Sequence, residues 1–363
     1  MNLVVFGLAI SSSWGNGHAT LWRGLCAALA ASGHRVTFFE RDVEWYAANR
    51  DYHELPGGRL ELYSDWKDVM PTARRLLAEA DAAIVTSYCP DALPAQQLML
   101  ATSGPMRVFY DLDTAVTLAR IAAGDYPSYI GPRLLADYDL VLSYSGGAAL
   151  GQLRERLKAR QVAPLYGSVD PAVHRPVAPR PNYRADLSYL GTYAPDRQGS
   201  LEELFLAPAR LARTGRFVLG GSGYPKDFPW TDNIYFVRHL PPGEHPVFYS
   251  SSRLTLNVTR AAMAATGYSP SGRLFEAAAC GTAILSDRWA GLDSFFEPGV
   301  EILLASNRES VLEAIQLSDG ELRRIGRAAR ERALAEHTAA HRAEELVRLL
   351  DSVHQSQQVS ADA

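Results

Sequence analysis

The sequence predicts an α/β protein built from two doubly wound domains. Short apolar runs of strand length alternate with segments in which apolar residues recur at helical spacing, and this alternation appears twice along the 363 residues. Between the two series, residues 170–181 contain four prolines, which excludes a helix or a central strand there. We therefore predict an N-terminal domain over 1–170, a linker over 171–184 and a second domain over 185–336.

Each predicted domain has its own series of strands, and ligands are expected at the carboxyl ends of those strands. In the first domain the strand-like runs are 3–8, 33–39, 82–86, 107–110, 140–143 and 162–165, with a helix over 19–31. In the second they are 187–190, 217–219, 234–237, 254–258 and 283–285, with a helix near 200–214. Helices are predicted over 319–335 and, after the second domain, within 337–355, and the small polar residues 356–363 predict a flexible tail.

Composition excludes several classes of protein. The formal net charge is −4, so no overall attraction to nucleic acid or to an anionic membrane is expected. No apolar run approaches the roughly 20 residues that span a bilayer, and the chain enters an apolar strand without a secretory signal. The three cysteines share no metal-binding spacing and are typical of a reducing compartment. We predict a soluble cytoplasmic enzyme and leave its oligomeric state open.

The most informative segment is a short predicted helix that opens near Ser271 and ends at Gly281. Free backbone N–H groups, Gly272 and Arg273 at its first turn are typical of a phosphate site. Glu276 lies one turn further along, where its carboxylate can accept hydrogen bonds from sugar hydroxyls. A phosphate and a sugar at one helix end indicate a nucleotide. The alternative is an ordinary buried helix in which Arg273 and Glu276 pair with each other.

A glycine-containing turn follows the first predicted strand, and His18 stands at its end. A dinucleotide fold would place a third glycine where this chain has Thr20, so that fingerprint is incomplete. A histidine at a strand-to-helix turn suits a general base, although a capping or structural role is the alternative. The residues of the turn form a predicted acceptor-side loop: Trp14, Gly15, Asn16 and Gly17.

Two carboxylates follow the predicted strand at 107–110. We assign Asp111 to binding or catalysis on the acceptor side and Asp113 to capping the next helix. No further acid or histidine cluster is adjacent, so a metal site is not expected.

Further donor-side candidates lie after strands of the second domain. Backbone amides of Gly191 and Thr192 come near a strand end, and Arg197 can pair with a phosphate. The loop that contains His239 can bind the base through backbone groups. Arg260 follows another strand and can supply a second positive charge.

Three segments of the second half resemble the CgeB-like branch of the GT-B glycosyltransferases (group 1). They are 273–281, 301–304 and 337–342. The resemblance implies two Rossmann-like domains facing a cleft, a nucleotide-sugar donor held by the second domain, and no requirement for a metal or other cofactor. It also implies that the final helix, 337–355, crosses back to the N-terminal domain.

One position departs from that pattern. Many retaining members carry two glutamates eight positions apart around this helix. Glu276 matches the second, which holds the ribose, whereas Tyr268 stands at the first. Retaining or inverting stereochemistry is therefore not assigned.

The expected function is metal-independent transfer of a sugar from a nucleotide-diphosphate sugar to an unidentified acceptor. His18 would act as the base if the enzyme inverts, or contact the donor sugar if it retains. Two alternatives stay open, a nucleotide-sugar epimerase of the same fold and a non-catalytic protein that binds sugar nucleotides. Base, sugar and acceptor cannot be read from the sequence.

Overall fold

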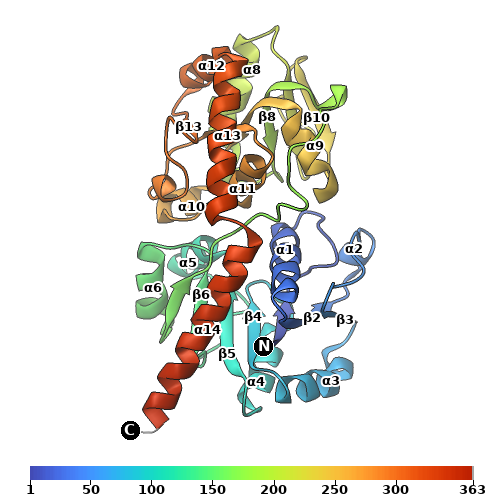
Figure 1. Cartoon of the computed structure of the whole chain (residues 1–363), viewed down its shortest axis with the longest axis vertical. Coiled ribbons are helices and arrows are strands. Elements are labelled where there is room, and N and C mark those ends of the chain that lie inside the picture. Colours follow the sequence, from blue (N-terminus) through green and yellow to red (C-terminus); the bar gives the residue numbers. More distant parts are fainter. Residues whose placement is uncertain (362–363) are drawn as a thin grey trace. The chain divides into compact units, whose positions relative to one another are not determined.

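A computed structural model of the chain describes residues 1–361, with side chains through Ser356. It contains two compact units (Figure 1). The first comprises Met1–Tyr166 together with the residues from Ala339 onward, and the second comprises Gly167–Thr338. The second unit thus begins before the linker predicted at 171–184. The reason is that Val169 pairs with Thr338 in a parallel bridge, and its N–H donates to the carbonyl of His337 at 3.0 Å.

The first unit is a seven-stranded parallel sheet in the order β3-β2-β1-β4-β5-β6-β7. Its strands are β1 (Asn2–Gly7), β2 (Arg35–Arg41), β3 (Arg59–Tyr63), β4 (Ala82–Thr86), β5 (Met106–Asp111), β6 (Leu140–Ser143) and β7 (Val162–Pro164). Its helices are α1 (Gly17–Ala31), α2 (Glu44–Ala47), α3 (Trp66–Ala78), α4 (Ala92–Leu100), α5 (Thr114–Ala122), α6 (Ala148–Leu157) and α14 (Ala339–Ala361).

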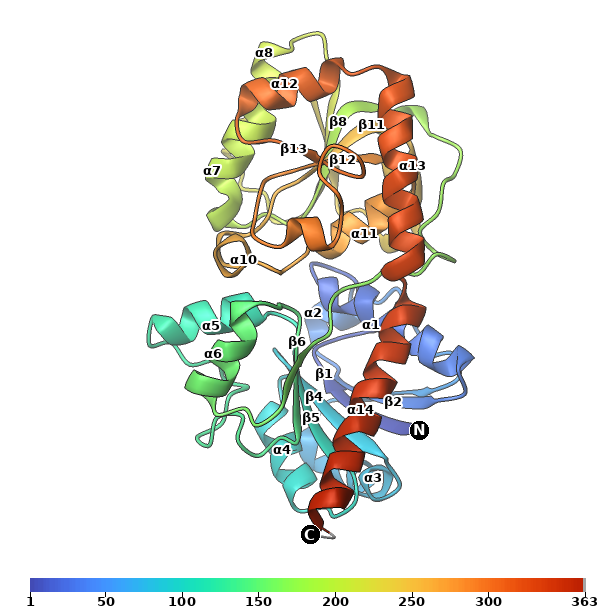
Figure 2. The ribbon, with the colours of Figure 1, turned by 60° about the vertical axis from the view of Figure 1, so that its left-hand side comes forward.

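Both faces of this sheet are buried because successive strand residues point to opposite sides. Phe6 and Phe109 pack with helices α3 to α6 on one face, whereas Val5 and Val108 pack with α1 and α14 on the other. Figure 2 shows α14 beside α1 along this second face. The last helix of the chain therefore completes the core of the first unit.

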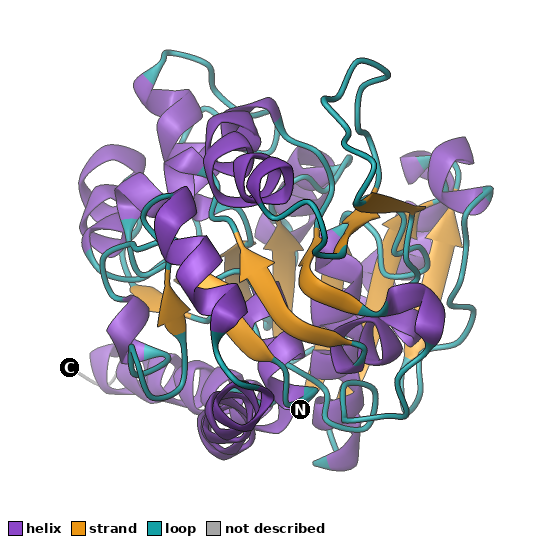
Figure 3. Ribbon diagram, turned by 90° about the horizontal axis from the view of Figure 1, so that it is seen from above, coloured by secondary structure: helices purple, strands orange, loops and turns teal. Residues whose placement is uncertain are grey.

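The second unit repeats this plan with a parallel sheet in the order β10-β9-β8-β11-β12-β13. Its strands are β8 (Ala185–Leu190), β9 (Phe217–Gly221), β10 (Ile234–Arg238), β11 (Ser252–Asn257), β12 (Ala283–Ser286) and β13 (Leu303–Leu304). Its α-helices are α7 (Gln198–Leu201), α8 (Ala207–Leu211), α9 (His245–Ser250), α10 (Ala261–Thr266), α11 (Gly272–Ala279), α12 (Arg308–Gln316) and α13 (Asp319–Glu336). Short 3₁₀ turns are η1 (Pro181–Tyr183), η2 (Pro195–Arg197), η4 (Pro242–Glu244) and η5 (Leu292–Ser294), and η3 (Glu202–Leu206) is a π-helical segment between α7 and α8. Figure 3 shows the strands between layers of helices.

In both sheets the chain order reverses beside the first strand, at β1/β4 and at β8/β11. The carboxyl ends of strands around such a reversal are where open α/β sheets bind ligands. The loops after β1 and β8 are therefore the two places at which the fold positions a site.

The structure adds two features to the sequence prediction. Strand β3 was not predicted, because its residues at the sheet edge are only partly buried and do not form an apolar run. Helix α14 continues through Ala361 into the segment predicted as a flexible tail, since 356–361 contain no glycine or proline to end it. Residues 362–363 lie outside the described part, and the flexibility of the tail stays a prediction. Within the described residues, no helix combines the length and the apolar character needed to cross a membrane.

Candidate functional site

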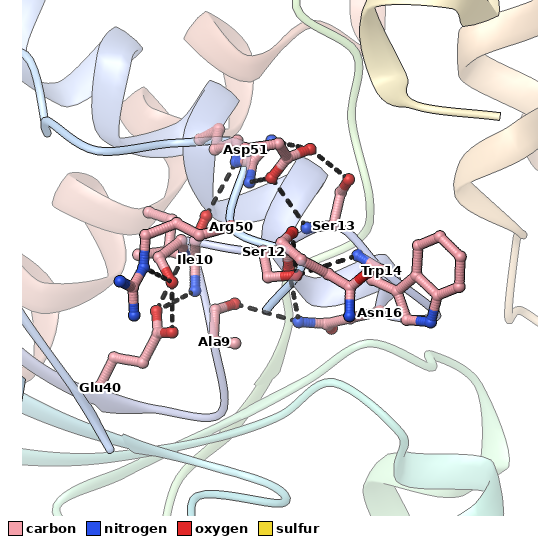
Figure 4. A network of polar contacts seen from close by, with 12 residues as sticks. Ala9, Ile10, Ser12, Ser13, Trp14, Asn16, Glu40, Arg50 and Asp51 are labelled. Atoms are coloured by element: carbon pink, nitrogen blue, oxygen red, sulfur yellow. Dashed lines mark hydrogen bonds and ion pairs between the residues drawn. The ribbon is translucent and has the colours of Figure 1, made fainter. Parts of the chain in front are cut away.

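In the first unit, the loop from β1 to α1 is held by the buried carboxylate of Glu40. One oxygen, Oε2, accepts the N–H groups of Ile10 at 2.7 Å and Ser11 at 2.9 Å, and Oε1 accepts the Ser11 hydroxyl at 2.6 Å (Figure 4). Glu40 lies in β2 close to its end, where a dinucleotide-binding domain keeps an acid for the ribose. In this chain the carboxylate of Glu40 accepts hydrogen bonds from the loop and is not available to a ribose. This agrees with the absence of the third glycine of the dinucleotide-binding fingerprint.

Asn16 then sets the start of α1. Its Oδ1 accepts the N–H of His18 at 2.9 Å, and its Nδ2 donates to the carbonyls of Ala9 at 3.3 Å and Ser12 at 3.4 Å. Figure 4 shows this amide reaching back under the loop. The network places His18 at the first turn of α1.

The other residues of the predicted acceptor-side loop, Trp14, Gly15 and Gly17, lie in the loop and at the start of α1. Gly15 has φ of +60°, a conformation that favours glycine. Gly17 is the first residue of α1. Trp14 packs edge-on against Trp45, with ring centroids 6.3 Å apart. The acceptor-side assignment of these residues stays a prediction.

His18 is paired with a carboxylate of the same unit. Its Nε2 lies 2.7 Å from Oδ2 of Asp113, and the two side chains are 13% and 26% exposed. The other ring nitrogen, Nδ1, is buried and has no hydrogen-bond partner among the described residues. When Nε2 donates to Asp113, Nδ1 carries the free lone pair. This arrangement orients an imidazole as a proton acceptor.

The environments of the two acids of this segment differ from those that the sequence predicts. Asp111 is fully buried at the end of β5, and its Oδ1 accepts the hydroxyl of Thr117 at 3.1 Å and the N–H of Asp113 at 3.0 Å. Asp113 occupies the cap position of α5 but its side chain makes no capping hydrogen bond, and it turns to His18 instead. Burial, followed by the charge of Asp113, raises the pKa of Asp111 to about 7. Asp113 is therefore the better candidate for a functional acid.

In the second unit, Arg273 reaches back from α11 across the ends of β8 and β11. Its Nε donates to the carbonyl of Leu190, and one terminal nitrogen donates to Oδ1 of Asn257 at 2.9 Å. Its guanidinium carbon lies 5.0 Å from the ring centre of Tyr189. The guanidinium is thus fixed at the carboxyl edge of the sheet.

A second guanidinium meets the same tyrosine. Arg197, at the end of η2, donates to the hydroxyl of Tyr189 at 2.9 Å, and its Nε is buried without a partner. Among the described residues, no carboxylate forms an ion pair with Arg197 or Arg273, although Arg260 pairs with Asp196 at 3.2 Å. Two converging positive charges without acids are suited to a diphosphate, and Arg260, already paired, is less suited to that role.

The other predicted donor residues lie in the loops that follow β8 and β10. Gly191 follows β8, and a Cβ there would lie 2.7 Å from Arg273. Thr192 is exposed, and its hydroxyl lies 3.5 Å from that of Ser222. His239 has a φ of +48°, and its N–H donates to the carbonyl of Gly221 at 2.9 Å, so that this N–H extends the strand pairing and is not free for a base.

Helix α11 begins as the sequence predicts. Ser271 is the cap residue by backbone geometry and Gly272 the first helical residue, but the Ser271 side chain makes no capping hydrogen bond. The first amides of a helix have no partners within it and favour an anion. Tyr268, which stands at the position of the missing glutamate, is 38% exposed and has a φ of +45°.

Glu276 lies in the middle of α11 with two histidines that the sequence reading missed. His245 Nδ1 is 3.3 Å and His174 Nε2 is 4.0 Å from its Oε2. Burial alone would raise the pKa of Glu276, but the two histidines, together with Arg273, lower it to about 2. Glu276 is therefore a carboxylate at neutral pH, as hydrogen bonding to a ribose requires. No spacing signal links residues 174, 245 and 276, which come from three separate segments.

Comparison with known proteins gives a partial sequence match and a full structural one. A family model described as glycosyl transferase-like matches residues 197–348, less than half of the chain. No curated protein sequence matches. The match includes α11, the pair of guanidinium groups and most of the second unit.

Solved structures align over the whole chain at low identity. Sucrose-phosphate synthase from Thermosynechococcus elongatus covers 100% of both chains, with 16% identity and a TM-score of 0.68. HepE of Anabaena, in complex with UDP-glucose, aligns over 97% of this chain and 100% of its own, with 11% identity and a TM-score of 0.66. An alpha-glucosyltransferase in complex with UDP-glucose and DNA aligns over 97% and 99%, with 13% identity and a TM-score of 0.72.

The fold is GT-B. The predicted pair of Rossmann-like α/β domains is confirmed, because both parallel sheets have the doubly wound strand order and the neighbours align over nearly their full lengths. A shared fold at such low identity does not assign an activity. The activity has to be argued from the residues.

Proposed function

We propose that the chain is a glycosyltransferase that uses a nucleotide-diphosphate sugar. The observation that carries this proposal is the pair Arg197 and Arg273, two guanidinium groups at Tyr189 that form no ion pair with a carboxylate of the described residues. The UDP-glucose complexes of two structural neighbours support a nucleotide-sugar donor. The family-model match over 197–348 supports the same class.

In this proposal the second unit binds the donor. Arg197, Arg273 and the first amides of α11 would stabilise the negative charge that develops on the leaving diphosphate, so that this role needs no metal ion. Glu276 would accept hydrogen bonds from the ribose. These donors are fixed before the reaction by their contacts with Tyr189, Leu190 and Asn257.

The first unit would supply the base. The imidazole of His18 would accept the proton of an acceptor hydroxyl, while the acceptor oxygen bonds to the anomeric carbon and the bond from that carbon to the diphosphate breaks. Asp113 stabilises the imidazolium that forms. A base held by a carboxylate favours this direct displacement over a role of His18 as a contact of the donor sugar.

Binding of nucleoside diphosphates tests the donor half. UDP and the other nucleoside diphosphates are screened by thermal shift, because a ligand that binds the folded state raises the melting temperature. For the best ligand, Arg197→Gln and Arg273→Gln should each weaken binding by about 10- to 100-fold, whereas the nucleoside without phosphates is little affected. Arg213→Gln, at an exposed arginine, is the matched control. If no nucleotide stabilises the wild-type protein, the proposal is wrong.

Release of nucleoside diphosphate from the bound sugar nucleotide tests the base. It should require an added acceptor and fall by about 100-fold or more in His18→Ala and Asp113→Asn. Release without any acceptor that survives both substitutions would instead support an epimerase.

A further inference from the structure

A cluster of His174, His245 and Glu276 lies within the second unit. His174 belongs to the segment that precedes η1, His245 is the first residue of α9, and Glu276 lies on α11, which contacts α9 (Figure 1). One ligand atom from each of the three lies within 4.8 Å of the other two. Three separate segments thus bring two imidazoles to one carboxylate oxygen.

The hydrogen bonds of His245 leave an acceptor facing an acceptor. Its Nε2 lies 3.2 Å from the carbonyl of Leu240, which can only accept, so Nε2 carries a proton. Nδ1 then faces Oε2 of Glu276 at 3.3 Å and makes no hydrogen bond of good geometry. With Nδ1 as an acceptor, this imidazole and the carboxylate oxygen opposite it are suited to bind a cation between them.

His174 presents the same requirement from the other side. The residue is 2% exposed, and neither of its ring nitrogens has a hydrogen-bond partner among the described residues. Burial lowers the pKa of His174. Buried polar atoms without partners are uncommon, and each needs an explanation.

From this geometry we infer that His174, His245 and Glu276 form a zinc site with one open coordination position. Two imidazole nitrogens and one carboxylate oxygen are a ligand set that zinc accepts, whereas magnesium and calcium prefer oxygen ligands. Tetrahedral coordination at about 2.0–2.2 Å places ligand atoms about 3.3–3.6 Å apart. The 3.3 Å separation of His245 and Glu276 already lies in this range, and the 4.0 Å separation of His174 and Glu276 requires a shift of less than 1 Å.

The carbonyl of Leu240 completes the arrangement. A metal-binding histidine commonly donates its second N–H to a backbone carbonyl, which fixes the tautomer and the ring orientation. His245 has this contact in place. The site goes beyond the proposed function, since the diphosphate would be bound by Arg197 and Arg273. Glu276 takes part in both, because the two histidines face its Oε2 and leave Oε1 for the ribose.

Equilibrium dialysis of the untagged full chain against zinc chloride, followed by elemental analysis, tests this inference. We expect one zinc per chain in the wild type and more than tenfold weaker binding in His174→Phe, His245→Phe and Glu276→Gln. His53→Gln, at an exposed histidine, should bind as the wild type does. Cobalt substituted for zinc should give the visible absorption of a four-coordinate site, and magnesium should not compete.

Circular dichroism in metal-free buffer shows which variants are folded, and only folded variants are compared. Less than one zinc per chain in the wild type would overturn the inference, and so would undiminished binding in folded Glu276→Gln. Thermal shift with UDP is measured on the same samples. If UDP binds and zinc does not, only the zinc site fails, whereas zinc binding without nucleotide binding leaves the zinc site and removes the proposed donor function.

Discussion

At the scale of single residues, two acids separated by one position have opposite environments. Asp111 is completely buried, and its Oδ2 has no hydrogen-bond partner among the described residues, whereas Asp113 is partly exposed and pairs with His18. Burial, with the charge of Asp113 next, raises the pKa of Asp111 to about 7. Ionisation of Asp111 at alkaline pH therefore lowers the stability of the folded first unit.

The first prediction concerns this loss of stability. The folded protein holds the proton of Asp111 up to about pH 7, whereas the unfolded chain releases it near 3.8, the ordinary pKa of an aspartate. The unfolded state thus binds fewer protons between these values, so this group lowers stability as pH rises from 4 to 7. Asp111→Asn should remove that pH dependence. Relative to the wild type, it should raise the free energy of unfolding of the first unit by roughly 2–4 kcal/mol more at pH 8 than at pH 4.

Urea unfolding at pH 4, 6 and 8 measures the effect. Asp68→Asn serves as the control, because Asp68 is an exposed aspartate of the same unit. Equal pH dependence in Asp111→Asn and the wild type would show that Asp111 does not titrate as described.

The sequence could predict the place of His18 in the fold but not its partner. A histidine directly after a glycine turn at the first strand has one possible place, the carboxyl edge of the sheet. Side chains two positions apart in a strand point to the same face, so the sequence pattern does not distinguish Asp111 from Asp113. Which of the two faces His18 depends on the path of the chain after β5. His174 and His245 could not be linked to Glu276, because only the packing of three distant segments brings them together.

At the scale of elements, the proposed diphosphate site depends on how closely α11 approaches the end of β8. Gly191 permits this approach, since a Cβ there would lie 2.7 Å from a terminal nitrogen of Arg273 and 2.8 Å from the Tyr189 hydroxyl. The same hydroxyl accepts a hydrogen bond from Arg197. A methyl group at position 191 would therefore disturb both guanidinium groups together.

Gly191→Ala is accordingly predicted to weaken binding of UDP, or of the nucleoside diphosphate that binds best, by roughly tenfold or more. Isothermal titration calorimetry measures the affinity. Gly199→Ala is the matched control, because a Cβ at Gly199 in α7 has no neighbour within 4 Å. Unchanged affinity in Gly191→Ala would locate the phosphates away from these arginines.

Most strands were predictable because interior strands of a parallel sheet are buried on both faces and appear as continuous apolar runs. The runs at 82–86 and 140–143 coincide with β4 and β6. The edge strand β3 lacks this signal, with Tyr63 its one buried residue. Composition therefore predicts neither the register of the strands nor which strand lies at the edge of a sheet.

At the scale of the whole molecule, the chain closes the first unit with its last helix. Leu346 and Leu350 of α14 belong to the same core as Trp22 and Leu25 of α1, more than 300 residues earlier in the chain. The first unit is therefore incomplete until the second has been synthesised. If the chain were divided at the proline-rich segment, the first unit would lose α14 and the stability that this helix contributes.

Leu346→Ala tests this dependence. Leu346 is 1% exposed, so removing its side chain leaves a cavity beneath α1 and should destabilise the first unit by about 2–5 kcal/mol. Hydrogen exchange followed by mass spectrometry should show faster exchange in α1 and β1, and unchanged exchange in β8 and β11 of the second unit. Leu349→Ala, at a partly buried leucine of the same helix, should have a smaller effect. Faster exchange confined to the second unit, or equal effects of the two substitutions, would contradict the assignment of α14 to the core of the first unit.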